Sequence, residues 1–325
     1  MSNAAAQSTA LSDTERSRLD DAARAGWLYY IAGNTQDQIA RKLNVSRATA
    51  QRLVSLSLQE RLITFRLEHP IAACMELATR LGERFGLGHC EVVPDDRSGQ
   101  SSTVGVAEAA AAFLEAKLRD PRPIIIALGT GRTLRAAVEQ VPPMDCPNHQ
   151  LVSLVGNISP DGSASSFNAV SRLADLTKAR HFPMPLPTFV ASAAEREQFF
   201  GIDAVRRLHA VAARADIRLV GLGQIDLAAP LHVDGFLSRD EVIDLMRRGA
   251  VGEITAWAMD AEGNVIEGGM NERVTSVRLA VPEEGLAVGV ATGTAKVPAI
   301  RAALRGRHLN GLITNEMTAK ALLEP

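Results

Sequence analysis

The 325-residue chain has few cysteines, few aromatic residues and no long apolar run. Its three cysteines are too few and too widely spaced for a disulfide framework or a four-cysteine metal site, and its seven histidines show no ligand spacing. We therefore expect no metal and no cofactor. Cys90 follows His89, but adjacent residues of an extended chain point to opposite faces, which favours a packed cysteine over an activated thiol.

No apolar segment approaches the roughly twenty residues that a membrane-spanning helix requires. Residues 1–20 also lack the apolar core of a secretory signal, so we expect a cytoplasmic protein that does not contact a membrane. A hydrophobic content of 46% over this length is enough for one small and one medium domain, each with its own core.

Charge is distributed unevenly along the chain. The net charge is −2, whereas residues 37–66 hold six basic and two acidic residues, a local balance of +4 that leaves −6 for the remainder. A basic segment in a slightly acidic protein is typical of a small nucleic-acid-binding unit.

Residues 36–53 have the pattern of a helix–turn–helix. Their apolar residues fall where two short crossed helices would bury them, and the small Ala40 lets the helices approach. Asn44 stands at the turn position that needs a positive φ, and Ser46 is a good N-cap for the second helix. That helix presents hydrogen-bond donors suited to the major groove, although a hairpin that only packs against another part of the protein remains the alternative. The candidate DNA-binding residues are Gln36, Lys42, Ser46, Arg47, Thr49, Gln51 and Arg52.

The domain organisation follows from these patterns. We expect a disordered leader at residues 1–14, a helix–turn–helix domain at residues 15–69 and an effector and oligomerisation domain at residues 70–325. The crowded Trp27, Tyr29 and Tyr30 are expected in the core and rim of the small domain rather than as a base-stacking platform. Within the small domain, a first helix is expected at 15–32, a recognition helix at 46–61 and the short strand of a near-winged unit at 62–67; a helix at 71–86 would dock on the large domain or dimerise.

Apolar strand-like runs then alternate with amphipathic helical stretches, which indicates an α/β domain with a mostly parallel sheet covered on both faces. Strands are predicted at 124–128, 151–155, 217–222, 286–290 and 309–314, and helices at 104–118, 133–140, 165–180, 194–199, 201–213, 238–247, 296–305 and 315–323. A strand at 249–260, a hairpin turn at 261–264 and a second strand after it are also expected.

The loop after the first of these strands has the composition of a phosphate-binding turn. Its two glycines let backbone N–H groups approach an anion, two threonines add hydroxyl donors, and an arginine adds charge at a helix start. It lacks the lysine spacing of a Walker loop and the third glycine of a dinucleotide fingerprint, and a tight structural turn is the alternative. The candidate residues are Gly129, Thr130, Gly131, Arg132 and Thr133.

A second glycine loop, at residues 291–296, also follows a strand and opens a helix. Lys296 would lie in the first turn of that helix, which is unfavourable for a cation unless an anion is bound there. Near other strand ends, Gln224, Glu253 and Asp260 are candidates for hydrogen bonds to hydroxyl groups, although residues of this kind are also common in ordinary turns. No nucleophile elbow or paired histidines are present, so the sequence does not indicate an enzyme.

Taken in order, these motifs resemble the SorC family of bacterial transcriptional regulators across residues 15–325. The resemblance rests on the helix–turn–helix, the loop at 128–133, the segments 249–254 and 260–264, and the ending at 296–304 and 312–319. It implies a DNA-binding domain joined to a Rossmann-like effector domain with the fold of the sugar-phosphate isomerases, which binds phosphorylated sugars without converting them. It also implies a homodimer or homotetramer that controls an operon for carbohydrate or polyol use.

Carried onto this chain, the resemblance implies phosphate contacts from the loop at 129–133 and from Lys296. Contacts to the sugar are implied for Asn157, Gln224, Glu253, Asp260 and Asn271. Family members often have glycine at the position of Thr292, and commonly aspartate at the positions of Glu253 and Asn315, so this chain departs from the family pattern at these three positions.

The expected function is therefore a regulator that binds double-stranded operator DNA and responds to a phosphorylated sugar or polyol. Two alternatives remain open at this point. One is a sugar-phosphate isomerase or deaminase-like enzyme with an appended DNA-binding module, which would have the same fold. The other is an oligomerisation protein without a ligand.

Overall fold

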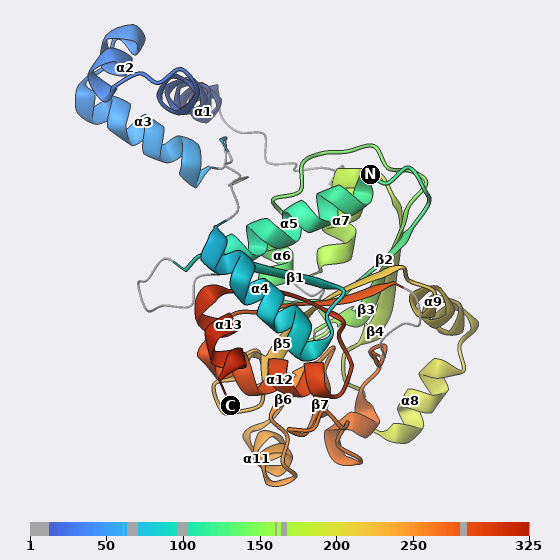
Figure 1. The fold of residues 1–325 in the computed structure, drawn as a ribbon. Coiled ribbons are helices and arrows are strands. Elements are labelled where there is room, and N and C mark those ends of the chain that lie inside the picture. Colours follow the sequence, from blue (N-terminus) through green and yellow to red (C-terminus); the bar gives the residue numbers. More distant parts are fainter. Residues whose placement is uncertain are drawn as a thin grey trace, which may run out of the picture. The chain divides into compact units, whose positions relative to one another are not determined.

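Figure 1 shows the computed structural model of the chain, which describes residues 13–60, 62–63, 71–95, 103–159, 161–163, 168–279 and 285–324. The chain divides into two compact units, Met1–His69 and Pro70–Pro325, and each is described by itself. Most of the expected leader and of the strand predicted at 62–67 lies outside the described residues. No helix in the described ranges is long and apolar enough to cross a membrane.

The first unit contains the expected helix–turn–helix. Its elements are α1 Asp13–Gly26, a π-helical turn η1 Trp27–Ile31, α2 Gln36–Leu43 and α3 Arg47–Gln59. Asn44 ends α2 in the left-handed conformation with φ 54°, as predicted, and the Ser46 hydroxyl caps α3 by accepting the Thr49 N–H at 3.1 Å. A capping box between Thr35 and Gln38, which sequence reasoning missed, fixes the start of α2.

The core of this unit is small and built mainly from short side chains. Ile39, Ala40, Ala50 and Val54 are buried where α2, α3 and α1 meet. Tyr30 packs against this cluster, whereas Trp27 and Tyr29 are on its rim, with 55% and 38% of their surface exposed. The expectation of core and rim positions for these aromatic residues matches their placement.

Close packing of α1 on α3 depends on Gly26. A Cβ added there would overlap the Ser57 hydroxyl and lie 2.7 Å from Ser57 Cβ, and Ser57 is fully buried. We expect Gly26→Ala to lower the free energy of unfolding of this unit by about 1–3 kcal/mol, because an over-packed core must shift its backbone. Chemical denaturation measures this loss. Gly82→Ala is the control, made in a helix of the second unit. No atom lies within 4 Å of a Cβ added at Gly82, so the free energy of unfolding of this variant should be unchanged or slightly higher.

The second unit is built on the predicted parallel sheet. Its strand order is β1-β9-β8-β5-β2-β3-β4, with parallel neighbours throughout, and the hairpin of β6 and β7 adds antiparallel to β5. The strands are β1 His89–Val93, β2 Ile125–Leu128, β3 Gln150–Ile158, β4 Arg180–Pro187, β5 Ile217–Gln224, β6 Gly252–Ile254, β7 Trp257–Met259, β8 Leu286–Val290 and β9 Gly311–Asn315.

Helices cover both faces of the sheet (Figure 1). The helices are α4 Ala72–Phe85, α5 Val104–Leu118, α6 Arg132–Val138, α7 Ala169–Thr177, α8 Ala193–Phe200, α9 Asp203–Ala213, α10 Pro230–Val233, α11 Arg239–Arg247, α12 Val297–Arg305 and α13 Glu316–Leu323, with 3-10 turns η2 Gly269–Arg273 and η3 Thr294–Lys296. Strand β2 shows that alternate residues face opposite layers of helices. Ile126 and Leu128 pack in a cluster with α5, α6 and α7, whereas Ala127 packs in a cluster with α4, α9, α12 and α13.

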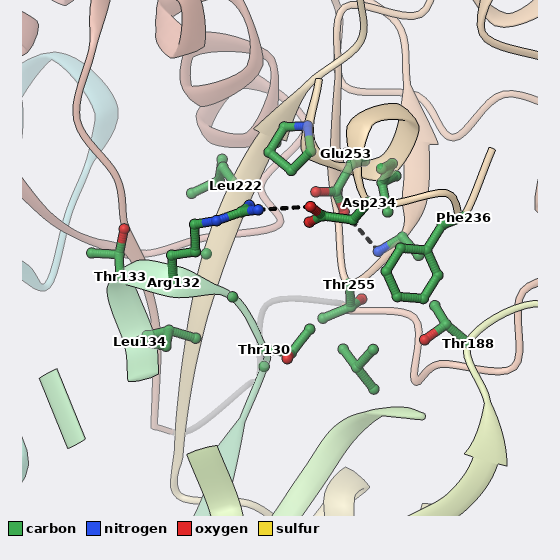
Figure 2. A pocket seen from close by; sticks show the side chains of 18 of the residues that line it. Thr130, Arg132, Thr133, Leu134, Thr188, Leu222, Asp234, Phe236, Glu253 and Thr255 are labelled. Atoms are coloured by element: carbon green, nitrogen blue, oxygen red, sulfur yellow. Dashed lines mark hydrogen bonds and ion pairs between the residues drawn. The ribbon is translucent and has the colours of Figure 1, made fainter. Parts of the chain in front are cut away.

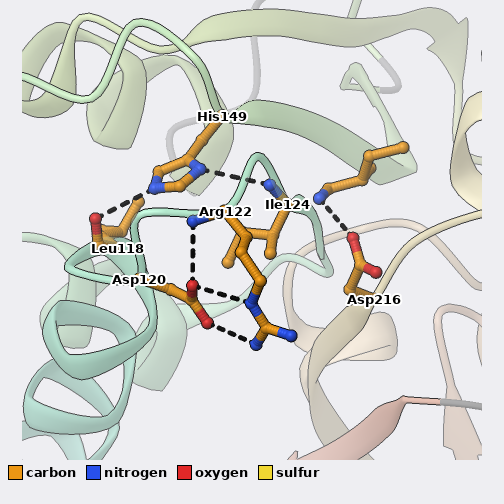
Figure 3. A network of polar contacts seen from close by, with 7 residues as sticks. Leu118, Asp120, Arg122, Ile124, His149 and Asp216 are labelled. Atoms are coloured by element: carbon orange, nitrogen blue, oxygen red, sulfur yellow. Dashed lines mark hydrogen bonds and ion pairs between the residues drawn. The ribbon is translucent and has the colours of Figure 1, made fainter.

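A polar network fixes the amino end of β2 (Figure 3). The His149 ring, which is 4% exposed, accepts the Ile124 N–H on Nδ1 at 3.2 Å and therefore donates from Nε2 to the Leu118 carbonyl at 3.0 Å. The Ile125 N–H donates to Asp216 Oδ2 at 2.7 Å. Because β2 is held at this end, the loop that follows its other end has a defined starting point.

The edges of the parallel sheet differ from the expected secondary structure. The edge strands β1 and β4 were not predicted, and the helix expected at 165–180 ends at Thr177, with β4 beginning at Arg180. Strand β4 contains three prolines, which an edge strand tolerates because its outer N–H groups need no partner.

The region from residue 249 was also predicted incorrectly in part. It is not one long strand, because Thr255 and Ala256 adopt positive φ angles of 50° and 70° and form a tight turn between β6 and β7. The expected turn at 261–264 is present and is followed by a single bridge between Met259 and Val265. Positive φ is unusual for a β-branched residue such as Thr255, so the composition of the segment did not reveal the turn.

Candidate functional site

A cavity of about 250 Å³ lies at the carboxyl ends of β2, β3, β5 and β8, where open parallel sheets bind ligands (Figure 2). It is lined by the loop after β2, by the last residues of β5, by the hairpin of β6 and β7, by the segment around α10, and by Lys296. The lining residues that sequence reasoning singled out are Gly129, Thr130, Gly131, Arg132, Thr133, Glu253 and Lys296.

The loop after β2 is anchored at its start and unusual in its middle. The Gly129 N–H donates to the Leu219 carbonyl at 2.9 Å, which continues the pairing of β2 with β5. Gly131 has φ 119°, a conformation that L side chains rarely adopt, and its carbonyl accepts the first hydrogen bond of α6. The loop thereby presents Thr130, Arg132 and Thr133 at the cavity.

The loop after β8 has a similar build. Gly293 has φ 112°, and its N–H donates to the Thr318 hydroxyl at 2.9 Å. Lys296 ends the 3-10 turn η3 and is the N-cap of α12, one residue before the first turn in which it was expected, and it lines the cavity half-buried. Burial lowers the pKa of Lys296, the Glu253 carboxylate opposes that shift, and the Arg132 guanidinium adds to it.

Glu253 is held against β5 by the tight turn. Its Oε2 accepts the Ala256 N–H at 2.7 Å, and its carboxylate lies against Gly223, where an added Cβ would overlap it. Burial raises the pKa of Glu253, and the Ala256 N–H and Lys296 oppose the rise. The cavity therefore contains a carboxylate with a fixed orientation next to a cation.

Several lining residues were not predicted from the sequence. Asp234 Oδ1 pairs with Arg132 Nη2 at 2.6 Å, and Phe236, Thr188 and Thr255 also face the cavity (Figure 2). Asp234 and Phe236 follow α10, a four-residue helix too short to give a periodic pattern. Only the fold brings this segment to the loop after β2.

Four predicted site residues do not line the cavity. The Asn271 amide is 3% exposed and bonds the backbone of Ala258 in both directions and the Ile266 carbonyl. Asp260 accepts the N–H groups of Glu262 and Asn264, so it stabilises its turn. Asn157 on β3 and Gln224 at the end of β5 lie beside lining residues without joining them.

The structure also bears on the reactivity of Cys90 and on metal binding. Burial raises the pKa of the half-buried Cys90 thiol to about 12, so it is protonated at neutral pH. Within the part of the chain that the structure describes, no cluster of three or more histidine, cysteine, aspartate or glutamate side chains is placed to hold a metal ion.

In the first unit, the outward face of α3 carries exposed Arg47, Gln51 and Arg52. Arg47 is 3.4 Å from Asp37 with both side chains more than 60% exposed, which makes this ion pair a weak interaction. The side chains of Ser46 and Thr49 bond to each other at 2.9 Å at the start of α3. Of the remaining candidates, Gln36 begins α2 and the Lys42 ammonium donates to Asn34 at 2.7 Å.

Comparison with known proteins identifies a family profile and sequence relatives that match the chain. A family profile described as "Putative sugar-binding domain" matches residues 69–324. The erythritol catabolism regulatory protein EryD of Brucella abortus is 32% identical over 302 residues, which cover 93% of this chain and 96% of that protein. The transcriptional regulator LsrR of Klebsiella pneumoniae is 29% identical over 93% of this chain and 92% of its own length.

Solved structures agree with the sequence relatives. The full-length sorbitol operon regulator SorC from Klebsiella pneumoniae superposes with a TM-score of 0.69 at 25% identity, covering 95% of this chain and all of that one. Both units, including the helix–turn–helix, therefore have counterparts in one regulator. The chain belongs to the SorC family of transcriptional regulators with a sugar-binding domain.

Proposed function

We propose that this protein is a DNA-binding regulator of an operon for polyol or sugar use, and that a small phosphorylated polyol or sugar is its effector. The observation that carries the proposal is the convergence of Arg132 and Lys296, from two separate glycine loops, on one cavity that also presents carboxylate and hydroxyl groups. Two cations beside threonine hydroxyls suit a phosphate, and the carboxylates suit the hydroxyl groups of a polyol.

The size and lining of the cavity support a small effector. At about 250 Å³ it lies slightly below the usual range of ligand pockets, roughly 300–1,000 Å³, which disfavours a nucleotide. The Phe236 ring and Leu222 give it apolar surface against which the carbon chain of a polyol can lie. The names of EryD and of the sorbitol operon regulator, which refer to polyols, agree with this class.

Glu253 and Thr255 supply the expected contacts to the carbon chain. A carboxylate accepts hydrogen bonds from hydroxyl groups, and the Ala256 N–H fixes the orientation of Glu253 so that it can accept without rearrangement. Thr255 lies in the same tight turn and its hydroxyl already donates to the Val277 carbonyl, so it remains able to accept. The phosphate would lie at the glycine loops and the hydroxyl groups at the hairpin.

DNA binding is proposed to occur through α3 on a double-stranded operator. One helix–turn–helix contacts a short half-site, so we propose that the protein binds as a homodimer or homotetramer. Effector binding would act by favouring one of two arrangements of the oligomer, because a ligand shifts an equilibrium only by its different affinities for the two states.

A thermal-shift panel tests the effector class directly. The purified protein is heated with matched pairs of free and phosphorylated compounds, such as four- to six-carbon polyols and their monophosphates. A bound ligand at 100 times its Kd stabilises the folded state by about 2.7 kcal/mol, so a phosphorylated compound should raise the Tm where its free partner does not. Stabilisation by free compounds alone would contradict a phosphate site.

The same panel separates a regulator from an enzyme of the same fold. Each stabilising compound is incubated with the protein and recovered for analysis by mass spectrometry and NMR. We expect it unchanged, since the chain belongs to a family of regulators. Conversion of the compound to a different sugar phosphate would favour the enzyme alternative.

A further inference from the structure

An ion pair joins opposite walls of the cavity. Arg132, which begins α6, and Asp234, which follows α10, are 102 residues apart in sequence, yet Nη2 and Oδ1 are 2.6 Å apart. The side chain of Asp234 is 23% exposed and that of Arg132 is 56% exposed, so the pair lies where the cavity meets solvent. Figure 2 shows the two side chains pointing toward each other.

The segment that carries Asp234 is stabilised largely by its own backbone. The Asp234 N–H donates to the Pro230 carbonyl at 2.8 Å, and the Leu237 N–H donates to the Leu231 carbonyl at 2.8 Å. Gly235 between them has φ 79°. Since Leu231 and Phe236 also line the cavity, this segment forms one wall, and the ion pair connects that wall to the loop after β2.

The cavity is lined by two basic and two acidic side chains. Arg132 and Lys296 contribute two positive groups, and Asp234 and Glu253 contribute two carboxyl groups. A guanidinium binds a carboxylate and a phosphate through the same N–H donors. A phosphate that enters the cavity therefore meets an Arg132 that already has an anionic partner.

We propose that Asp234 is a specificity-determining residue that occupies Arg132 in the place of the effector's phosphate. A neutral sugar or polyol that breaks the pair leaves Arg132 without an anionic partner, whereas a phosphate replaces the partner that Arg132 loses, so the ion pair disfavours unphosphorylated compounds more strongly than phosphorylated ones. Displacement of Asp234 also releases the wall formed by residues 230–237 from the loop after β2. The inference rests on the proposed function, because it assigns a role within the same site.

Titration calorimetry with inorganic phosphate at low ionic strength tests the competition. Asp234→Asn keeps the size of the side chain and removes its charge, and should bind phosphate about three- to fivefold more tightly than the wild type, which corresponds to the loss of one partly exposed ion pair. Asp240→Asn is the matched control, because it makes the same charge change on an exposed residue of α11 outside the cavity, and its Kd should equal that of the wild type.

A double-mutant cycle with Arg132→Ala completes the test. If Asp234 acts by competing for Arg132, adding Asp234→Asn to Arg132→Ala should change phosphate affinity less than twofold. Equal or weaker phosphate binding by Asp234→Asn in the wild-type background would overturn the inference, as would the same gain in Asp240→Asn. Melting curves of each variant show whether it is folded, and Asp234→Ser repeats the charge removal with a smaller side chain.

Failure of this inference is distinguishable from failure of the proposed function. If a phosphorylated polyol still raises the Tm of the wild type while Asp234→Asn gains nothing, the effector site stands and Asp234 has another role. If no phosphorylated compound stabilises the wild type, the proposed function itself fails.

Discussion

Replacement of Lys296 by alanine is expected to weaken binding of the phosphorylated effector by about 100-fold, or roughly 3 kcal/mol, which is the scale of a charge-assisted hydrogen bond in a partly buried site. The half-buried Lys296 lines the cavity and is the N-cap of α12, a place that disfavours a cation without an anion nearby. Without Lys296, the proposed phosphate site loses the cation contributed by the second glycine loop.

Calorimetry with the stabilising compound from the thermal-shift panel measures this loss. Lys320→Ala is the matched control, because Lys320 on α13 is 64% exposed and does not line the cavity. We expect the control to bind like the wild type. Equal affinities for wild type and Lys296→Ala would show that the second glycine loop does not hold the phosphate.

Replacement of Arg47 or Gln51 is expected to relax the sequence preference of DNA binding by about 1–3 kcal/mol at one position of the half-site. Both side chains are exposed on the outward face of α3, the helix expected to enter the major groove. Lys42 lies at the end of α2, where the first helix of the motif crosses the DNA backbone. Lys42→Ala should therefore weaken binding to every duplex and reduce the salt dependence by about one ion.

Fluorescence anisotropy on an operator chosen from a pool of random duplexes, and on a random duplex of the same length, separates these roles at several salt concentrations. Equal losses on both duplexes for all three variants would contradict base contacts by Arg47 and Gln51. Glu60→Gln, a charge change on an exposed residue just past the end of α3, should leave the ratio of the two affinities unchanged.

Local chemistry explains which parts of the fold were predictable. Asn44 and Ser46 determine their own backbone geometry through a tolerated positive φ and a side-chain cap, so the turn and the start of α3 followed from residue types alone. The buried strands were equally clear because they are short apolar runs. Strand β4 was missed because its three prolines are acceptable only at a sheet edge, and edge position depends on the strand order.

Some residues of the candidate site could likewise be predicted from the sequence, and others could not. Both glycine loops follow buried strands, so their convergence at the carboxyl edge of the sheet was predictable. Asp234 was not, because its role depends on a contact with Arg132 across 102 residues of sequence. Asn271 looks like a ligand residue in sequence, yet the backbone groups of Ala258 and Ile266 use its amide, and only packing could reveal that.

The most direct test of the account is the operator affinity of the wild type and of Lys296→Ala, measured by anisotropy with and without the stabilising phosphorylated compound. We expect the compound to change the wild-type Kd for operator by at least about fivefold, the lower range of allosteric coupling, and to leave Lys296→Ala unchanged at the same concentration. An unchanged wild-type Kd with the effector site saturated would show that binding in this cavity does not control DNA binding, and would contradict the account.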